Sequence, residues 1–302
     1  MGLNKFLLVF SLYTLVNYNL SAKDTAFSKP QKLYIITAST AVVAGHTSLY
    51  FLWYANYPKS NFHFINDNKE WKQMDKFGHA FSAYNISNAA YQTCKKIGFN
   101  KKKSLIYGGL LGLIFQTPIE VFDGISAAWG ASAGDIIANT AGWGLFYGQQ
   151  IFFDKQIACF KWSFKNSGYA TLRPNTLGGN FSERILKDYN GQTYWLSFNL
   201  KDISGLKKMP AWINIALGYG AKGMIGGNSN LIYDNNGILK NDYSNIPRYR
   251  TYSASLDIDL SRIKTNRRLL TGIFRYFNWI KIPFPSVGYN RINGLHGNWI
   301  GF

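Results

Sequence analysis

The stretch SAGDIIANTAGWGLFYGQQIFF, residues 132–153, contains the last of three long uncharged runs in the chain. The two earlier runs are Leu33–Tyr57 and Ser104–Ile119. Between them, Trp71–Cys94 has the pattern of a further helix and leads into a basic turn that contains Gly98. Four helices are therefore expected over residues 33–153.

The first uncharged run is long enough to cross a bilayer, which takes about 20 mainly apolar residues. Glycines spaced four apart occur in the other two runs, and such pairs let helix backbones approach closely in a membrane. Hydroxyl side chains and His46 make the first run more polar than a lipid-facing helix, so a buried core helix is the alternative. We expect a helical bundle that is embedded in a membrane or lies against one.

The pattern of apolar residues changes after the third run, where they begin to alternate with polar or small ones. The clearest cases run from Tyr194 to Leu200, from Ile213 to Ala221 and from Tyr252 to Leu260. A period of two is typical of half-buried antiparallel strands. The expected fold class is therefore α+β, with a helical segment over residues 23–159 followed by a mainly antiparallel β-rich segment over residues 160–302.

Two features of the C-terminal segment leave alternatives open. Arg262–Trp279 has the pattern of a basic amphipathic helix, which suits either a membrane surface or packing on the sheet. About 140 residues ending at Phe302 would also suffice for a minimal outer-membrane barrel of eight strands. Fewer strands than that are clearly patterned, so a sheet is the first expectation.

Charge and the N-terminus indicate an exported protein. The chain has 33 Lys and Arg against 15 Asp and Glu, a net charge of +18, which indicates an acidic partner unless the whole proteome is basic. Met1–Lys5 is basic, Phe6–Val16 is apolar and Asn17–Ala22 is polar with small residues, as in a secretory signal peptide. Residues 1–22 are therefore predicted to be removed. Export, and the lack of a nucleic-acid-binding motif, leave anionic lipid or a membrane surface as the expected partner rather than nucleic acid.

Familiar sequence motifs do not identify a reaction. The two cysteines, Cys94 and Cys159, form neither a CxxC pair nor a disulfide framework, and no lipobox cysteine follows the signal-like segment. The sequence also lacks HExxH, GxSxG and P-loop motifs. Any site must therefore be sought in the spacing of single polar residues.

A polar set in the helical segment carries the most specific chemistry. Asp75 and His79 are four residues apart, which places both side chains on one helix face, and Ser82 continues that face as part of a polar network. A carboxylate beside a histidine orients the ring and raises its basicity, as general bases and metal ligands require. Asp75, Lys76 and His79 are therefore the catalytic candidates, with a structural ion pair as the alternative.

Acids in the later part of the helical segment extend this set. Glu120 and Asp123 follow an apolar run, where acids are costly unless they are used, although a solvated helix end would also hold them. Ser132 and Asp135 have the spacing of a capping box, whereas Asp135 and Asn139 share a helix face. The candidate metal ligands are Glu120, Asp123 and Asp135. The residues expected to converge on one site are Asp75, His79, Glu120, Asp135 and Asn139.

Three spaced motifs within Trp71–Phe146 carry a resemblance to a known family. They read W-x-x-M-D-K-F-G-H, I-E-V-F-D-G and W-G-A-S-A-G-D-I-I-A-N-T-A-G, and span about a quarter of the chain. They resemble the YfiM-like family of bacterial envelope proteins, a domain of unknown function, and more distantly the VanZ-like membrane family associated with glycopeptide resistance. The resemblance places the polar residues named above at motif positions. It implies no reaction.

Three functions are compatible with these residues. In the first, the chain is a membrane-associated envelope protein with a structural or lipid-interacting role, and the polar set holds the bundle together. In the second, it is a membrane-interface hydrolase or transferase that acts on a phosphorylated lipid or envelope precursor. There His79 would be base or nucleophile, and Lys76 would hold phosphate. Glu120 or Asp135 would then bind a metal or act as the acid. In the third, the acids bind a cation or small ligand without turnover.

Overall fold

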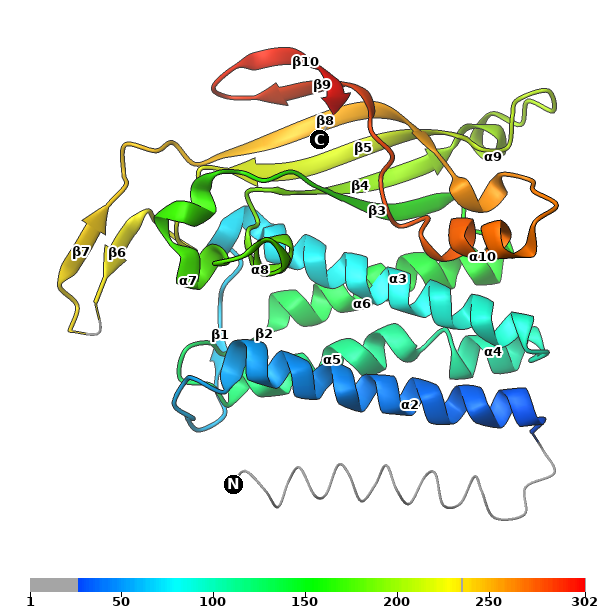
Figure 1. Ribbon diagram of the computed structural model, residues 1–302, viewed down its shortest axis with the longest axis horizontal. Coiled ribbons are helices and arrows are strands. Elements are labelled where there is room, and N and C mark those ends of the chain that lie inside the picture. Colours follow the sequence, from blue (N-terminus) through cyan, green and yellow to red (C-terminus); the bar gives the residue numbers. More distant parts are fainter. Residues whose placement is uncertain (1–26, 235, 302) are drawn as a thin grey trace. The chain divides into compact units, whose positions relative to one another are not determined.

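The computed structural model describes residues 27–234 and 236–301, and the predicted signal peptide, residues 1–22, lies outside this part. The described chain divides into two compact units, which are treated separately below. Their elements are drawn in Figure 1. The described residues are 27–65 and 86–131 in unit 1 and 66–85 and 132–301 in unit 2, apart from residue 235.

Helix α3 (Met74–Lys96) contributes its first half to unit 2 and its second half to unit 1. The two compact units therefore divide the chain at other positions than the predicted segments 23–159 and 160–302. Those segments were defined by the change from uncharged runs to alternating apolar residues. Those segments stay a prediction about domain organisation.

Unit 1 is mainly helical. Helix α2 (Lys29–Leu49) begins at a capping box formed by Ser28 and Gln31, and it continues into a π-helical turn, η1 (Tyr50–Tyr54). After the second half of α3 come α4 (Lys101–Tyr107) and α5 (Leu111–Gly124). Two very short strands, β1 (Phe64–Ile65) and β2 (Ala131–Ser132), pair with each other, and the boundary between the units falls within β2.

Two helical stretches of unit 1 are long and apolar enough to cross a membrane, by length and composition alone: Lys29–Tyr54 and Lys101–Gly124. They contain most of the first two uncharged runs of the sequence. The third run lies in α6 (Ala133–Phe152) of unit 2, which does not share this property. Large apolar side chains are exposed on α2 and α5, including Leu33, Ile36, Ile114 and Val121.

Unit 2 is built on a sheet of six strands in which all neighbours are antiparallel. Across the sheet the strands are β10 (Gly294–Gly301), β9 (Phe284–Asn290), β8 (Tyr249–Ile258), β5 (Ile213–Lys222), β4 (Gln192–Asn199) and β3 (Ala158–Phe164). The three alternating stretches of the sequence form β4, β5 and β8, so these predicted strands are confirmed. Helices come first and the sheet later, which confirms the α+β class.

Short elements connect the strands of unit 2. They are η3 (Tyr169–Leu172), α7 (Pro174–Leu177), α8 (Phe181–Lys187), α9 (Leu200–Ser204), η4 (Leu260–Arg262), α10 (Arg268–Tyr276) and the hairpin of β6 (Leu231–Tyr233) and β7 (Leu239–Asp242).

The basic helix predicted over Arg262–Trp279 is shorter in the structure, where α10 covers only its middle part. The chain turns through η4 first, because the side chain of Asp259 accepts the backbone N–H of Ser261 at 3.0 Å and caps this 3-10 turn. Ile263 is then extended. The turn that Asp259 caps therefore ends at Arg262, where the backbone becomes extended, and the helix begins only at Arg268.

One face of the sheet packs in part against α3 and α6, as Figure 1 shows. Phe77 stacks on Tyr219 with ring centroids 4.4 Å apart. The two helices themselves approach closely at Gly142, where a Cβ atom would collide with the backbone of Ala80. This close approach brings the polar residues of both helices together.

Candidate functional site

Helix α3 begins after η2 (Glu70–Gln73), a turn that contains three non-glycine residues with left-handed backbone. Trp71, Lys72 and Gln73 have φ values of 43°, 49° and 65°. Such a conformation costs roughly 1–2 kcal/mol per residue, so tertiary contacts must hold it. The N–H of Trp71 donates to the carbonyl of Gly227 at 2.8 Å, and the Tyr219 hydroxyl donates to the carbonyl of Lys72. These contacts fix where the first turn of α3 points.

The ammonium of Lys76, in that first turn, lies among three carboxylates. Its Nζ is 2.6 Å from Asp67 Oδ2, 2.8 Å from Asp135 Oδ1 and 3.5 Å from Asp75 Oδ2. The hydroxyl of Ser132 donates to Asp67 Oδ1 at 2.6 Å. Three ionised acids around one ammonium leave two negative charges in excess. The arrangement therefore favours a further cation or a proton.

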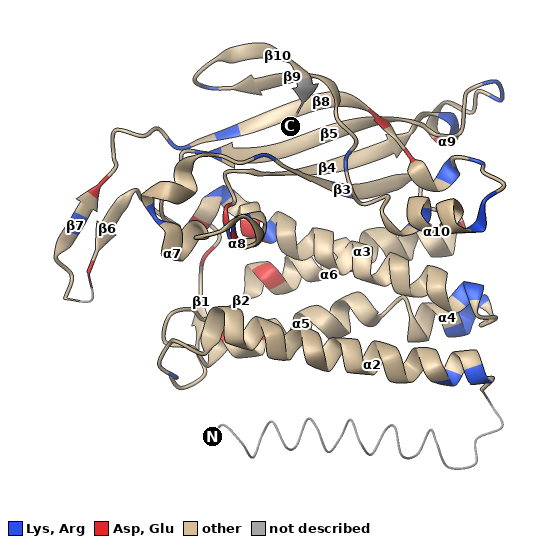
Figure 2. Cartoon of the chain, viewed as in Figure 1, with Lys and Arg blue, Asp and Glu red and all other residues tan. Residues whose placement is uncertain are grey.

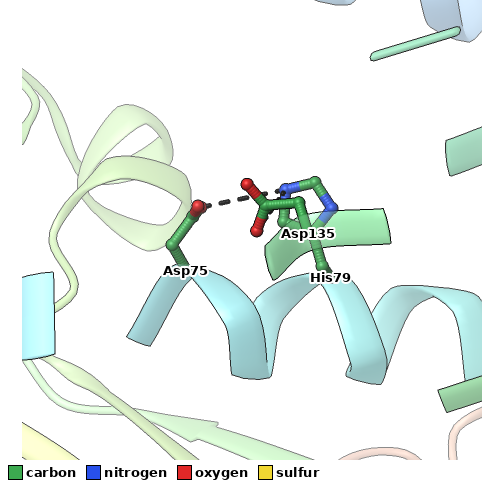
Figure 3. Close-up of side chains that lie close together, drawn as sticks. All are labelled: Asp75, His79 and Asp135. Carbon is green, nitrogen blue, oxygen red and sulfur yellow. Dashed lines mark ion pairs between the residues drawn. The ribbon is translucent and has the colours of Figure 1, made fainter. Parts of the chain in front are cut away.

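The ring of His79 faces two of these carboxylates, as Figure 3 shows. Nδ1 lies 3.1 Å from Asn139 Oδ1, so we assign the proton of the neutral ring to Nδ1. Nε2 then presents its lone pair to Asp135 Oδ1 at 3.8 Å and to Asp75 Oδ1 at 3.9 Å. These three electron-rich atoms repel one another unless a proton on Nε2 or a bound cation lies between them.

Asp135 belongs to the first turn of α6, whose N-cap is Ser132. The Ser132 hydroxyl accepts the backbone N–H of Asp135 at 3.2 Å, which is the serine half of the predicted capping box. The Asp135 carboxylate instead accepts a hydrogen bond from Lys76 Nζ at 2.9 Å. A Cβ atom at Gly134 would collide with Asn68 and Lys76, so a residue without a side chain is needed beside this contact.

Two further residues, Tyr189 and Asp67, contact these side chains, and no sequence pattern predicts their contacts. The hydroxyl of Tyr189, in the loop between α8 and β4, donates to Asp75 Oδ1 at 2.6 Å across 114 positions of sequence. Asp67 lies in the loop before η2, and no helical spacing relates it to Lys76. We refer to the following residues as the polar cluster: Asp67, Asp75, Lys76, His79, Ser132, Asp135, Asn139 and Tyr189.

Burial and neighbouring charge change the proton affinities within the polar cluster. Burial, followed by the charge of Asp75, raises the pKa of Asp135 to about 7. Burial lowers the pKa of Lys76, but the charge of Asp75 and hydrogen bonds to Asp135 and Asp67 outweigh it and raise this pKa. Burial opposes the hydrogen bonds from Lys76 and Ser132 to Asp67, whose pKa is nevertheless lowered. At neutral pH the lysine is therefore charged and Asp135 is partly protonated.

The remaining predicted site residues are Glu120, Asp123 and Ser82. Glu120 and Asp123 are in α5 of unit 1, where Glu120 is buried and Asp123 Oδ1 accepts a hydrogen bond from the Tyr54 hydroxyl at 2.8 Å. Their part in a metal site, and the convergence of Glu120 on the polar cluster, stay predictions. Ser82 lies on α3 after His79 and is partly buried.

Every residue of the polar cluster except Tyr189 falls between positions 67 and 139 of the chain. That block has a recognised counterpart. Residues 63–149 match the model of a family described as predicted periplasmic lipoproteins (DUF2279). No curated protein and no solved structure matches the chain.

The family match indicates an exported protein associated with the cell envelope. It covers the motifs that resemble the YfiM-like and VanZ-like families, but it does not confirm either of those families. Both cysteines are buried, Cys94 in α3 and Cys159 in β3.

Asp75, His79 and Asp135 have a geometry that fits a divalent cation. One ligand atom from each residue lies within 4.8 Å of the other two. Bonds of about 2.1 Å to a tetrahedral ion would place ligand atoms about 3.4 Å apart, so a small inward movement of the side chains closes the site. The side chains of His79 and Asp75 are 12% and 28% exposed, which leaves a route for an ion to enter.

Proposed function

We propose that this envelope-associated protein binds a divalent cation through Asp75, His79 and Asp135. The observation that supports this most is the position of His79 Nε2, which lies 3.8 Å from Asp135 Oδ1 and 3.9 Å from Asp75 Oδ1 while Asn139 contacts the opposite ring nitrogen. A hydrogen bond on the far nitrogen is the usual arrangement for a metal-bound histidine, because it fixes the tautomer and the ring orientation. A divalent ion would also balance the two excess negative charges of the polar cluster.

The type of ion follows from the ligands. One imidazole nitrogen and two carboxylate oxygens suit Zn²⁺, Mn²⁺ or Fe²⁺ better than a soft copper ion, which prefers sulfur. Ca²⁺ prefers six to eight oxygen ligands, so a site with one nitrogen and two carboxylates fits it less well. We therefore expect a first-row transition ion or zinc.

Turnover is the second candidate function. A bound divalent ion polarises phosphoryl oxygens, which is the chemistry that a hydrolase of phosphorylated lipid or envelope precursors needs. The partial exposure of Asp75 would give such a substrate access. Lys76 has less support as a phosphate-holding group, because its ammonium already contacts three carboxylates. We therefore place cation binding ahead of catalysis.

Membrane association is the second part of the proposal. Lys29–Tyr54 and Lys101–Gly124 have the length and composition of membrane spans, and apolar side chains are exposed along them. Basic residues gather at α4, as Figure 2 shows, and Lys101, Lys102 and Lys103 form its first turn. Lysines at the end of a membrane-length helix are well placed to contact anionic headgroups.

Cation binding can be tested by titrating the purified full-length chain with Zn²⁺ and with Co²⁺ at pH 8, followed by calorimetry and visible absorption. We expect one ion per chain, with binding abolished in His79→Ala. Asn139→Ala should weaken binding by about 10–100-fold, because it removes only the orientation of the ring. Circular dichroism of each variant would separate loss of the site from loss of the fold.

A matched control for these variants is Glu183→Gln. Glu183 pairs with Lys187 on α8 at 3.7 Å, so this change removes a helix carboxylate from an ion pair outside the polar cluster. It should bind Zn²⁺ as the unaltered chain does. Absence of saturable binding in the unaltered chain, or equal binding in folded His79→Ala, would refute the proposed site.

A further inference from the structure

The sheet of unit 2 has a polar face that is buried. Lys161 Nζ on β3 lies 2.8 Å from Asp257 Oδ2 on β8, and both side chains are fully buried. Lys281 Nζ adds hydrogen bonds to Ser255 Oγ at 3.3 Å and to the carbonyl of Leu256 at 3.0 Å. Strands β4 and β5 lie between β3 and β8, so in a flat sheet these two would be about 14 Å apart. The sheet is therefore curved around polar side chains.

The opposite face is apolar, and the strand register aligns its side chains in rows. Tyr219 pairs with Tyr252, which pairs with Tyr289, and Leu217, Ala254 and Val287 form the next row. Helix α3 covers this face over β4 and the edge of β5, where Phe77 contacts Tyr194 and Tyr219. Over the rest of β5 and over β8, β9 and β10 the apolar side chains are exposed.

We call this exposed area the outer patch. Its members are Ile215, Leu217, Tyr252, Leu256, Val287, Tyr289, Leu295 and Trp299. Leu217 and Val287, near its centre, are 54% and 53% exposed. Soluble antiparallel sheets usually turn their apolar face to the core and their polar face to water, so the polarity is inverted in the part of the sheet that α3 leaves uncovered.

Basic residues border the outer patch at both ends. At one end Arg250 and Arg291 follow the tyrosine row, and at the other Lys207 and Lys208 are exposed in the turn before β5. Asp257 is the one acidic residue among the described residues of β5, β8, β9 and β10, and its side chain lies on the buried face. None of the acids in these strands therefore lies on the outer patch. The outer patch is therefore apolar in its middle and positively charged at its rim.

We propose that the outer patch docks on one leaflet of an anionic membrane, with its aliphatic side chains among the acyl chains. The tyrosine row would lie at the level of the headgroups, where amphipathic aromatic rings are favoured. The basic rim would contact anionic lipid, each Lys or Arg adding to the attraction. This docking surface belongs to unit 2 and depends neither on the cation site nor on the membrane spans of unit 1.

Lipid fits this surface better than a second copy of the chain. A symmetric pair would bring two basic rims together, and like charges across an interface are unfavourable. An anionic leaflet instead supplies the opposite charge at the rim and an apolar medium in the centre. The unpaired edge of β10 would stay at headgroup level, where water can satisfy its backbone groups.

The proposal can be tested with single cysteines at the centre of the outer patch. The variants Leu217→Cys and Val287→Cys are labelled with the fluorophore NBD on the full-length chain. Each is mixed with vesicles of phosphatidylethanolamine and phosphatidylglycerol that carry a doxyl quencher on the acyl chain. We expect a blue shift of NBD emission and loss of fluorescence to the quencher at both positions. Native Cys94 and Cys159 are buried, and the chain without an added cysteine measures their background.

Asn245→Cys is the matched control, because Asn245 is exposed in the loop before β8 and lies outside the outer patch. It should show neither the blue shift nor quenching, even when the spans of unit 1 hold the chain in the vesicle. Equal, weak quenching at all three positions would overturn the proposal. So would efficient disulfide formation between Cys variants of Val287 in two chains, because it would show that a second copy covers the patch.

Discussion

Asp135 is the residue in which burial, helix capping and charge meet. It lies in the first turn of α6, where the helix dipole favours its charge, but burial and the charge of Asp75 oppose ionisation and raise its pKa to about 7. Lys76 alone cannot balance the three acids around it. A proton on Asp135 and a divalent cation beside it are therefore competing ways to reduce the same excess of negative charge.

This competition makes cation binding depend on pH. Below pH 7 Asp135 holds a proton that the cation must displace, so the affinity for Zn²⁺ should fall by up to about tenfold for each pH unit. Above pH 7 Asp135 is ionised in the free protein, and its contribution to the pH dependence should level off. Zn²⁺ titrations between pH 5.5 and 8.5 measure this. His79 also binds a proton more readily as the pH falls, so it acts in the same direction.

The variant Asp135→Asn separates the effect of the Asp135 proton on cation binding from that of the His79 proton. Asparagine has no carboxyl proton to lose and carries no negative charge. The variant should therefore bind Zn²⁺ weakly, with a shallower dependence on pH than the unaltered chain. An affinity that stays constant from pH 5.5 to 8.5 in the unaltered chain would contradict the proposed role of Asp135.

At the scale of elements, the approach of α3 and α6 positions the polar cluster. Asp75 and His79 lie one turn apart on α3, and Asp135 and Asn139 do the same on α6. The two pairs meet because Gly142 lets the backbones come together farther along the helices. A side chain at that position would push apart the helices on which the cluster depends.

Gly142→Ala is therefore expected to destabilise unit 2 by about 1–3 kcal/mol, because the added methyl group would collide with the backbone of Ala80. The control is Gly144→Ala on the same helix, where a Cβ atom meets nothing within 4 Å. That change should be neutral or stabilising by up to about 1 kcal/mol. Thermal melts of the two variants decide this, and equal melting temperatures would show that the close approach is not limiting.

At the scale of the whole molecule, the chain combines a helical unit that contains two membrane-length stretches with a unit based on a curved sheet. Formal charge is +18, and the family match indicates the envelope as its location. The net charge is also the reason why we propose contact with an anionic membrane.

Membrane anchoring through unit 1 predicts that alkaline carbonate leaves the protein in the membrane pellet. Ile114→Arg should release a large share of it, because Ile114 is exposed on α5 and an arginine at mid-helix costs about 2.5–3.5 kcal/mol on insertion. Lys102→Arg, which keeps the charge in the first turn of α4, is the control and should stay in the pellet. Full release of the unaltered chain by carbonate would show that these helices do not anchor it.

Spacing along the chain was enough for features that depend on sequence neighbours. The alternation in Tyr252–Leu260 identified a strand, because side chains on a strand alternate between its two faces whatever the rest of the fold does. The pairs Asp75 with His79 and Asp135 with Asn139 were also readable, since residues four apart share a helix face. The length of α10 was not, because the backbone becomes extended at Ile263 within an otherwise suitable pattern.

Features that depend on distant parts of the chain could not be predicted from spacing, because they arise only from tertiary packing. Alternation shows that a strand has two different faces, but it does not show which face is buried; in this sheet the polar face is buried and the apolar face is covered only in part. Tyr189 reaches Asp75 across 114 positions, and Lys161 reaches Asp257 across a curved sheet. No local periodicity records such contacts. They exist because packing and strand register bring these side chains together, and only in that arrangement do the buried charges compensate one another.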